Sequence, residues 1–392
     1  MMGYDACTRC GECTVTCPTG GEADDDELVT PRGKILKVRE IYRRELGLRA
    51  RLFGPRQVPE SELKELSEKI YDCTVCGQCR SVCPSHLDTI PMWENMREFL
   101  VSNHLGPMAP HEQLVKSIDN YDNPWMQPRT QRSRWQKRLE KDLKIKDALK
   151  EHPEVLYFVG CTAAYDPNIR GMALDTATVL GKAGVDLGTL GNDEGCCGST
   201  LMRVGLADVA RGAVLRNIER FEKSGCGTIV TSCAGCYKTI KQDYPKFGKV
   251  GARVLHTSQL VWELIDSGKL RLTKPVPCTV TFHDPCHLGR HNRLFEEPRK
   301  ILESIPGVKL VEMERNREEA RCCGAGGGVK TAFPEVAAKI SGLRVKDAEQ
   351  VGAQVMVTSC PFCYQSLKSG IETARSDLRM IDLMELVRSS CG

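Results

Sequence analysis

The segment TIVTSCAGCYKTIK, residues 228–241, recurs further along the chain as VMVTSCPFCYQSLK, residues 355–368. In each copy a short apolar run comes directly before a C-x2-C pair, and a pattern with helical spacing follows the pair. An apolar run of this length predicts a short buried strand. The two segments therefore predict a strand, a cysteine pair and a helix that occur twice in one chain.

The repetition extends over the second half of the chain, at an offset that grows by one residue at each step. A single cysteine recurs at an offset of 125 residues, a Cys-Cys-Gly motif at 126 and the C-x2-C pair at 127. We interpret this pattern as an internal duplication with five cysteines in each copy. The first copy contains Cys161, Cys196, Cys197, Cys233 and Cys236, and the second contains Cys286, Cys322, Cys323, Cys360 and Cys363.

Parallel strands would bring these distant cysteines together. VLYFV at 155–159 also predicts a buried strand, and ligands gather at the carboxyl ends of parallel strands in strand-helix folds. Two adjacent cysteines do not point the same way from a regular element, so each Cys-Cys-Gly motif predicts a loop wrapped round an inorganic core. Glycines support such a loop because they permit unusual backbone angles and close approach. They are Gly198, Gly324, Gly326, Gly327 and Gly328.

The glycine run also has a nucleotide-binding interpretation, which we set aside. In GAGGGV, residues 324–329, Val329 stands at the sixth position of G-x-G-x-x-G, and no strand clearly leads into the motif. Five thiolates per copy exceed the four that an ordinary cubane cluster requires. Each copy is therefore expected to hold something other than a simple four-cysteine cluster.

Two further cysteine runs lie near the start of the chain. CTRCGECTVTCP at 7–18 and CTVCGQCRSVCP at 73–84 both have the C-x2-C-x2-C-x3-C-P spacing of bacterial ferredoxins, in which the fourth cysteine ligates the neighbouring cluster. Zinc also uses C-x2-C pairs, but it closes its site with four ligands and has no use for a third step and a proline. We expect Cys7, Cys10, Cys13 and Cys83 to hold one cubane cluster, and Cys73, Cys76, Cys79 and Cys17 to hold the other.

Composition narrows the class of protein. The chain has 392 residues with 55 Lys and Arg against 51 Asp and Glu, which gives no general electrostatic reason to expect nucleic acid or an anionic membrane surface. It shows no apolar run long enough for a membrane helix and no signal-peptide pattern, so we expect a cytoplasmic protein that reaches a membrane only through a partner. The 21 cysteines, an odd number, favour metal ligands over a disulfide framework.

The insert between the two ferredoxin runs is expected to be a pair of helices. KILKVREIYRREL at 34–46 and SELKELSEKI at 61–70 have helical spacing and charge. This pattern resembles the helical ferredoxin of succinate dehydrogenase iron-sulfur subunits and of the small heterodisulfide reductase subunit. We interpret the basic segment at 37–46 as a solvated face, with docking of an acidic electron donor as the alternative.

The whole arrangement resembles the heterodisulfide reductase family. The duplicated part is similar to the paired CCG domains of its catalytic component, and the fusion behind two ferredoxin runs, with the connector at 120–135, is similar to the D subunit of the membrane-linked enzyme. The resemblance implies a mixed α+β and α/β fold class. It implies an all-helical ferredoxin-like domain at 1–100, a helical connector at 101–152, and two duplicated Rossmann-like α/β CCG domains at 153–275 and 276–392.

The resemblance also implies cofactors and an activity. In that family each CCG motif holds a noncubane [4Fe-4S] cluster, and the pair reduces the mixed disulfide of coenzyme M and coenzyme B. The implied protein is an oxidoreductase subunit that takes electrons through two cubane [4Fe-4S] clusters to two noncubane clusters and reduces, or forms, a disulfide. The alternative is an electron-relay subunit without a substrate, similar to those of glycolate oxidase and anaerobic glycerol-3-phosphate dehydrogenase. A flavoprotein or a membrane cytochrome b is the expected redox partner.

Three histidines surround Cys286 at four-residue spacing. His283, His287 and His291 could align on one helical face, and His287 is the candidate proton donor. The alternative is that these side chains have no role in proton transfer and hydrogen-bond to the backbone or to cluster sulfur.

Other conspicuous residues have simpler interpretations. Tyr237 and Tyr364 follow the two C-x2-C pairs at equivalent positions and are expected to pack beneath the clusters. Cys226, Cys278 and Cys391 fall outside both patterns and are expected to be plain thiols.

Overall fold

The computed structural model describes residues 2–20, 25–140 and 143–392, which form two compact units. Both units are built from interleaved segments of the chain, and the four-domain division expected from the sequence remains a prediction. The first unit comprises Met1–Glu112, Thr200–Ala207 and Arg321–Ser341, and the second comprises Gln113–Ser199, Asp208–Ala320 and Gly342–Gly392.

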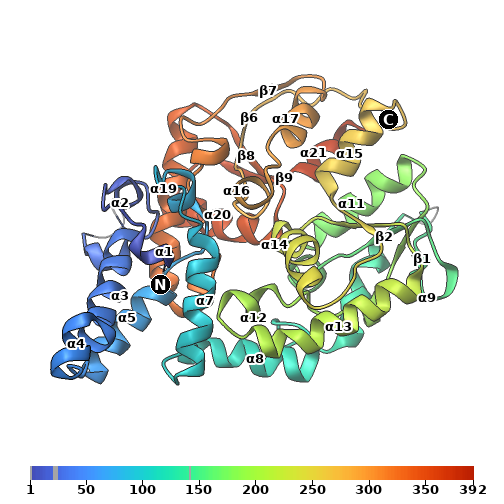
Figure 1. The fold of residues 1–392 in the computed structure, drawn as a ribbon. Helices are drawn as coiled ribbons and strands as arrows, with labels where there is room; N and C mark the ends of the chain where they lie inside the picture. The colour runs from blue at the N-terminus through green and yellow to red at the C-terminus, as the bar shows by residue number, and fades with distance from the viewer. Residues whose placement is uncertain (1, 21–24, 141–142) are drawn as a thin grey trace. The chain divides into compact units, whose positions relative to one another are not determined.

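Helices make up the regular structure described in the first unit (Figure 1). The helices expected at 34–46 and 61–70 are confirmed as α3 and α5. Thr30 accepts a hydrogen bond from the backbone N–H of Gly33 and caps α3 ahead of Pro31, a residue suited to the first helical position. The helices wholly or partly in this unit are α1 (Met2–Asp5), α2 (Glu12–Val15), η1 (Glu27–Val29), α3 (Pro31–Leu46), α4 (Leu48–Phe53), α5 (Glu60–Tyr71), α6 (Gln78–Ser81), α7 (Thr89–Ser102), α8 (Ala109–Tyr121), α12 (Ser199–Arg203), the first residue of α13 (Ala207–Ser224), α18 (Val329–Ala332) and α19 (Pro334–Gln350).

A buried arginine joins the three segments of the first unit. Arg97 on α7 is 0% exposed, and its guanidinium donates hydrogen bonds to backbone carbonyls from all three segments. Because a guanidinium stays charged in proteins, these carbonyls replace the water that burial removes. The acceptors are Arg203 at 2.6 Å and Gly327 at 2.7 Å from Nη1, and Ile70, Tyr71 and Cys73 at 2.9, 3.1 and 2.6 Å from Nη2.

Two parallel sheets organise the second unit. The strands predicted at 155–159, in TIVTS and in VMVTS are confirmed as β2, β4 and β8. The first sheet has the order β1-β3-β2-β4-β5, with bounds Lys146–Asp147, Leu187–Thr189, Val155–Tyr157, Thr228–Thr231 and Arg253–His256. The second has the order β7-β6-β8-β9, with bounds Val308–Leu310, Cys278–Phe282, Val355–Thr358 and Arg379–Asp382.

The two sheets share one strand order, apart from β1 at the edge of the first. That two-residue strand lies in the connector, for which the sequence predicted only helix. In each sheet the order reverses between two central strands, β2 and β4 or β6 and β8, and open parallel sheets bind ligands at this reversal. Cys161 and Cys233 follow β2 and β4, and Cys286 and Cys360 follow β6 and β8. The duplication therefore places cysteines at the reversal point of both sheets.

Helices connect the strands of the second unit. Its described helices include none that is long and apolar enough to cross a bilayer, and the same holds for those of the first unit. The helices wholly or partly in this unit, besides α8, α12 and α19, are η2 (Arg129–Arg138), α9 (Ala148–Glu151), α10 (Cys161–Tyr165), α11 (Arg170–Lys182), η3 (Gly191–Asp193), α13 (Ala207–Ser224), α14 (Ala234–Lys238), η4 (Thr239–Asp243), η5 (Tyr244–Lys246), α15 (Thr257–Asp266), α16 (Gly289–Asn292), α17 (Glu296–Glu303), η6 (Arg317–Glu319), α20 (Pro361–Ala374) and α21 (Leu383–Ser390).

Replacing Arg97 by methionine is expected to lower the free energy of unfolding of the first unit by about 3–5 kcal/mol, because several buried carbonyls lose their donor. The midpoint of urea unfolding, followed by circular dichroism, measures this change. Arg43→Met, at an exposed position of α3, is the control and should change the free energy by about 0.5 kcal/mol or less. Equal midpoints for the two variants would contradict the structural role assigned to Arg97.

Candidate metal centres

The five cysteines of the first copy converge in the second unit. Cys161 begins α10, the Cys196-Cys197 pair lies in the loop before α12, and the C-x2-C pair opens α14. The thiols form an unbroken series of hydrogen bonds that runs from Cys161 through Cys196, Cys197 and Cys236 to Cys233. The fold thus brings together all the cysteines that the sequence groups in this copy.

The series of thiols continues into the second copy. Cys233 and Cys363 both donate hydrogen bonds to Cys360, and these bonds hold the pKa of Cys360 well below its usual value. A hydrogen bond from Cys196, and another from the next thiol in the series, lower the pKa of Cys197 to about 6. Each copy therefore contains a thiol that ionises readily, and the thiolate is the form of cysteine that binds metal.

Glycines allow the close approach of backbone and thiols in the first copy. Gly160 has a φ of +78°, and a Cβ there would lie 3.2 Å from the sulfur of Cys236. Gly198 has a φ of +79°, and its backbone N–H lies 3.4 Å from the sulfur of Cys196. Both positions combine a left-handed backbone with a thiol contact, which a side chain would disturb.

The glycine run of the second copy packs against the second ferredoxin run within the first unit. A Cβ on Gly326 would lie 2.7 Å from the carbonyl oxygen of Thr74, and one on Gly327 would lie 2.5 Å from that of Cys73. This backbone contact accounts for Gly326 and Gly327 and is the close approach that the glycines were expected to allow, while the loop around an inorganic core stays a prediction. The Cys-Cys-Gly motif of the second copy is consequently joined to the ferredoxin part of the chain.

A buried arginine from the connector contacts the first copy, and we did not predict it. Arg132 in η2 is 2% exposed, and its Nη1 and Nη2 lie 3.6 and 3.5 Å from the sulfur of Cys161. Glu194 accepts from Arg132 at 2.6 Å and from the backbone N–H groups of the two residues before Cys161, at 2.8 and 2.9 Å. The sequence does carry one signal of this site. Glu194 stands two residues before the Cys-Cys-Gly motif of the first copy, whereas the second copy has Ala320 at the equivalent position.

The electrostatic effect of this pair is visible in the arginine. Burial disfavours the charged guanidinium, but the electrostatic influence of the neighbouring Cys161 and Glu194 side chains holds the pKa of Arg132 well above its usual value. The ring of Tyr165 also faces the guanidinium, 5.5 Å away. A permanent positive charge therefore lies directly beside one thiol of the first copy.

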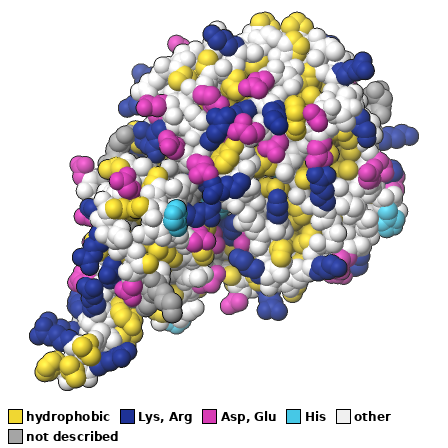
Figure 2. Space-filling view, turned by 45° about the horizontal axis from the view of Figure 1, so that its top comes forward, with side chains coloured by type: hydrophobic (Ala, Val, Ile, Leu, Met, Phe, Trp, Pro, Cys, Tyr) yellow, Lys and Arg dark blue, Asp and Glu magenta, His cyan; other side chains and the backbone are white. Residues whose placement is uncertain are grey.

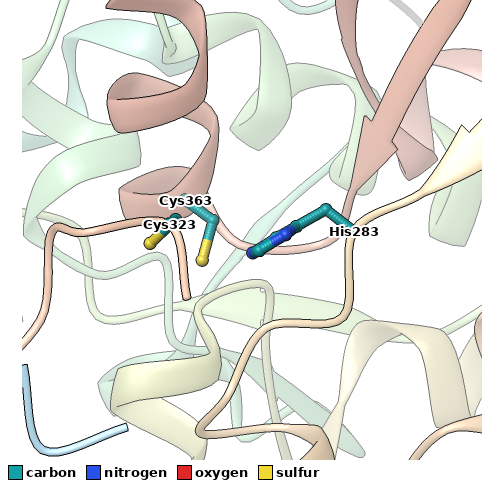
Figure 3. A group of neighbouring side chains, drawn as sticks. All are labelled: His283, Cys323 and Cys363. Carbon is teal, nitrogen blue, oxygen red and sulfur yellow. The ribbon is translucent and has the colours of Figure 1, made fainter. Parts of the chain in front are cut away.

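A neutral histidine lies beside the second copy. His283 follows β6, and its ring points toward Cys363, with a ring nitrogen within 4.8 Å of the sulfur (Figure 3). Arg344 donates to its Nδ1 at 3.2 Å, and because a guanidinium cannot accept, the proton of the neutral ring is on Nε2. Nε2 is buried and has no hydrogen-bond partner among the described residues. Burial, with the charge of Arg344, lowers the pKa of His283 to about 3.

The three histidines do not share a helical face, in contrast to one interpretation of their spacing. His283 lies in an extended segment and His287 in a turn, and α16 begins only after both of them. The rings of His287 and His291 nevertheless lie 4.5 Å apart. A Cβ on Gly235 would be 3.7 Å from both His287 Nδ1 and the sulfur of Cys233. His287 therefore lies next to the C-x2-C turn of the first copy.

The ferredoxin runs gather their thiols in two groups within the first unit. One pocket is lined by Cys7, Cys10, Cys13 and Cys83, with Cys79 also on its wall. Cys17 lies with the second run instead: burial raises its pKa to about 11, the charge of Lys34 opposes this, and the charges of Cys73 and Cys76 add to it. The fourth cysteine of each run is therefore close to the first three of the other run.

The chemistry of the donors fits iron-sulfur clusters. All 21 cysteines, which lie in the described part of the chain, are thiols and not disulfides, and most are at least half-buried. The first copy gathers five thiols, and zinc has no use for a fifth thiolate. Cys226, Cys278 and Cys391 lie apart from these groups, and the first two donate to local backbone carbonyls.

The tyrosines after the C-x2-C pairs differ in burial. Tyr237 is fully buried, packs edge-on against His256 and accepts a hydrogen bond from Lys241 at 2.6 Å. Tyr364 is half-buried, and burial raises the pKa of its hydroxyl. Tyr237 is therefore packed in the interior, as expected from the sequence, whereas Tyr364 is only partly so.

Comparisons with known proteins agree with the geometry. Residues 3–87 match the family model described as a 4Fe-4S dicluster domain, and residues 155–241 and 280–368 match that of the cysteine-rich domain CCG. The D subunit of dihydromethanophenazine:CoB–CoM heterodisulfide reductase from Methanosarcina barkeri is 41% identical over 397 residues, which cover 100% of this chain and 95% of the relative. The protein of that name from Methanosarcina mazei is 40% identical with the same coverage.

The chain belongs to the family of heterodisulfide reductase D subunits. It is an iron-sulfur oxidoreductase subunit with a 4Fe-4S dicluster domain and two cysteine-rich domains, as the sequence predicted. A more distant relative is the B subunit of fumarate reductase (CoM/CoB) from Methanothermobacter marburgensis, 34% identical over 338 residues, or 86% of this chain and 64% of the relative. In this heterodisulfide reductase homologue, each cysteine-rich match contains the strand reversal described above.

The contribution of the Arg132–Glu194 pair to the stability of this heterodisulfide reductase homologue can be measured. Arg132→Met leaves a buried carboxylate without its cation and is expected to lower the free energy of unfolding by about 3–5 kcal/mol. Arg134→Met, an exposed position in the same helix, is the control. The double variant Arg132→Met/Glu194→Gln should lose less than the sum of the single variants, because the two residues act as one pair. Additive losses in thermal unfolding would show that the pair is not coupled.

Proposed function

We propose that this protein carries electrons through two cubane clusters to two noncubane clusters that reduce, or form, a disulfide or related sulfur compound. The ferredoxin-like domain would be all-helical and would exchange its fourth ligands. The proposed cubane ligands are Cys7, Cys10, Cys13 and Cys83 for one cluster and Cys73, Cys76, Cys79 and Cys17 for the other. The proposed noncubane ligands are the five cysteines of each copy, Cys161, Cys196, Cys197, Cys233 and Cys236, and Cys286, Cys322, Cys323, Cys360 and Cys363.

The observation that carries this proposal is the hydrogen bond from Cys233 to Cys360. It brings a thiol of the first copy against a thiol of the second within the second unit, which supports two adjacent cluster sites. Cleavage of a disulfide consumes two electrons, whereas a cluster of this kind supplies them one at a time. Two adjacent sites suit that stoichiometry better than two separate sites would.

The contact between the glycine run and the second ferredoxin run supports a route for the electrons. Arg97 joins the carbonyls of Cys73 and Gly327, at 2.6 and 2.7 Å, and Gly327 belongs to the loop that carries Cys322 and Cys323. Hydrogen-bonded backbone thus links a proposed cubane ligand to the second copy. We infer that electrons arrive at the second copy first.

The chain also offers groups for the proton side of the reaction. When a disulfide bond is reduced, the sulfur–sulfur bond takes up two electrons and two protons and yields two thiols. His287 lies next to the C-x2-C turn of the first copy in the second unit and remains the proposed proton donor. His283 does not suit this role, since its pKa of about 3 leaves the ring neutral at physiological pH. It can instead donate a hydrogen bond toward sulfur.

Relatives inform the choice of substrate and partner. The Methanosarcina relatives are named for the CoB–CoM heterodisulfide and dihydromethanophenazine. We propose the same class of substrate, a small disulfide, for this chain. Its redox partner would be a flavoprotein or a membrane cytochrome b, and the cytochrome would hold a cytoplasmic protein at the membrane. The alternative is an electron-relay protein that passes electrons between partners and has no substrate of its own.

The cluster assignment predicts the metal content. Protein prepared without oxygen should contain about 16 iron atoms per chain, four for each of four clusters. Cys83→Ala should remove the cluster of the pocket that Cys83 lines and leave about 12 iron atoms. Cys226→Ala is the matched control, and its iron content should not change. Zinc in place of iron, or iron sufficient for only two clusters, would refute the assignment.

The function is tested on the reduced, isolated protein. Adding a small disulfide such as the CoB–CoM heterodisulfide should reoxidise the clusters, release thiols and produce a paramagnetic signal that depends on the substrate. His287→Gln should slow reoxidation by about 100-fold or more, as for loss of a general acid. His86→Gln, an exposed position, should react at the normal rate. Failure of all thiols and disulfides to change the signal would favour the relay.

A further inference from the structure

An exposed group of apolar and basic side chains lies where α3 meets α4. Four large apolar side chains project into solvent there, whereas Ala50 of α4 is 7% exposed and packs inward. The loop after α4 contributes a further arginine. We define the α4 tip as the apolar residues Leu46 (57% exposed), Leu48 (76%), Leu52 (67%) and Phe53 (82%), with the exposed arginines Arg43, Arg49, Arg51 and Arg56.

Basic side chains surround the apolar ones at this tip. Figure 2 shows hydrophobic and Lys/Arg side chains side by side at its lower left, the end where Figure 1 places α4. Among the described residues, no carboxylate forms an ion pair with Arg43, Arg49, Arg51 or Arg56. The neighbouring Arg44, by contrast, pairs with Glu62 at 2.9 Å. The tip therefore presents four arginines, with the exposed Glu45 as the one carboxylate within residues 43–56.

The α4 tip is separate from the proposed cluster sites. Ile35 of α3 lines the cysteine pocket, and Leu46 lies eleven residues further along the same helix. At about 1.5 Å per residue the tip is about 16 Å from the pocket along the helix axis. A partner bound at the tip therefore leaves the pocket accessible.

We propose that the α4 tip binds an anionic lipid surface directly. Leucine and phenylalanine flanked by arginine is the composition of helices that lie in the membrane interface, where apolar side chains enter the acyl boundary and cations meet lipid headgroups. The tip is a short projecting helix with long side chains, which suits insertion into a deformable surface better than contact with a flat protein face. The total charge of the chain does not predict such a surface, because positive and negative residues nearly balance over the whole chain while arginines are in excess at the α4 tip.

Vesicle binding tests the proposal on the full-length protein prepared without oxygen. The protein should sediment with vesicles of phosphatidylcholine and phosphatidylglycerol, bind pure phosphatidylcholine more weakly, and lose most binding at about 0.5 M salt, where charges are screened over a few ångströms. The triple variant Leu48→Ser/Leu52→Ser/Phe53→Ser should bind about tenfold more weakly or worse. Arg49→Ser/Arg51→Ser/Arg56→Ser should lose the preference for anionic lipid.

A matched control separates the tip from general surface effects. Val209→Ser/Leu215→Ser removes two exposed apolar side chains from α13, which are 40% and 41% exposed, and should bind like the unaltered protein. Iron content and visible absorption show whether each variant is folded. The proposal is overturned if the unaltered protein does not bind anionic vesicles, or if the leucine–phenylalanine variant binds them equally well. Loss of a co-purifying protein in the tip variants, without any vesicle binding, would likewise overturn it in favour of an acidic protein partner.

Discussion

A hydrogen bond between Cys233 and Cys360 joins the two sheets of the second unit at their cysteine-bearing ends. Each residue follows a central strand, β4 or β8, at the point where the strand order of its sheet reverses. A parallel sheet leaves room for ligands there because the loops on either side of the reversal diverge to opposite faces. The two duplicated sheets therefore bring one thiol from each copy into contact.

The side chains around the thiols differ between the two copies. Cys161 of the first copy faces the guanidinium of Arg132, which Glu194 holds in place. In the second copy Ala320 replaces the glutamate, and the neutral ring of His283 faces Cys363. The Arg132–Glu194 pair therefore has no counterpart at Ala320, whose carbonyl instead accepts a hydrogen bond from the buried Arg290 at 2.5 Å.

Interleaved segments explain how the ferredoxin part is joined to the duplicated part. The Cys-Cys-Gly loop of the second copy belongs to the first unit, where Gly326 and Gly327 pack against Thr74 and Cys73. Arg97 completes the contact by donating to carbonyls of all three segments. A buried charge that needs several acceptors can be satisfied only when the segments are correctly assembled, so Arg97 makes the assembly specific.

Sequence spacing was sufficient for the convergence of the five cysteines of the first copy, the strands predicted before the cysteines and the helices at 34–46 and 61–70, because each of these features depends on neighbouring residues and on a periodicity that can be read locally. It was not sufficient for Arg132, for the packing of the glycine run on Cys73, or for the separation of His283 from the helix that follows. Arg132 approaches Cys161 across 29 residues and Arg97 approaches Gly327 across 230, and contacts of such separation leave no periodic trace. They arise when buried charges and close backbone contacts find partners, and the folded chain alone supplies those partners.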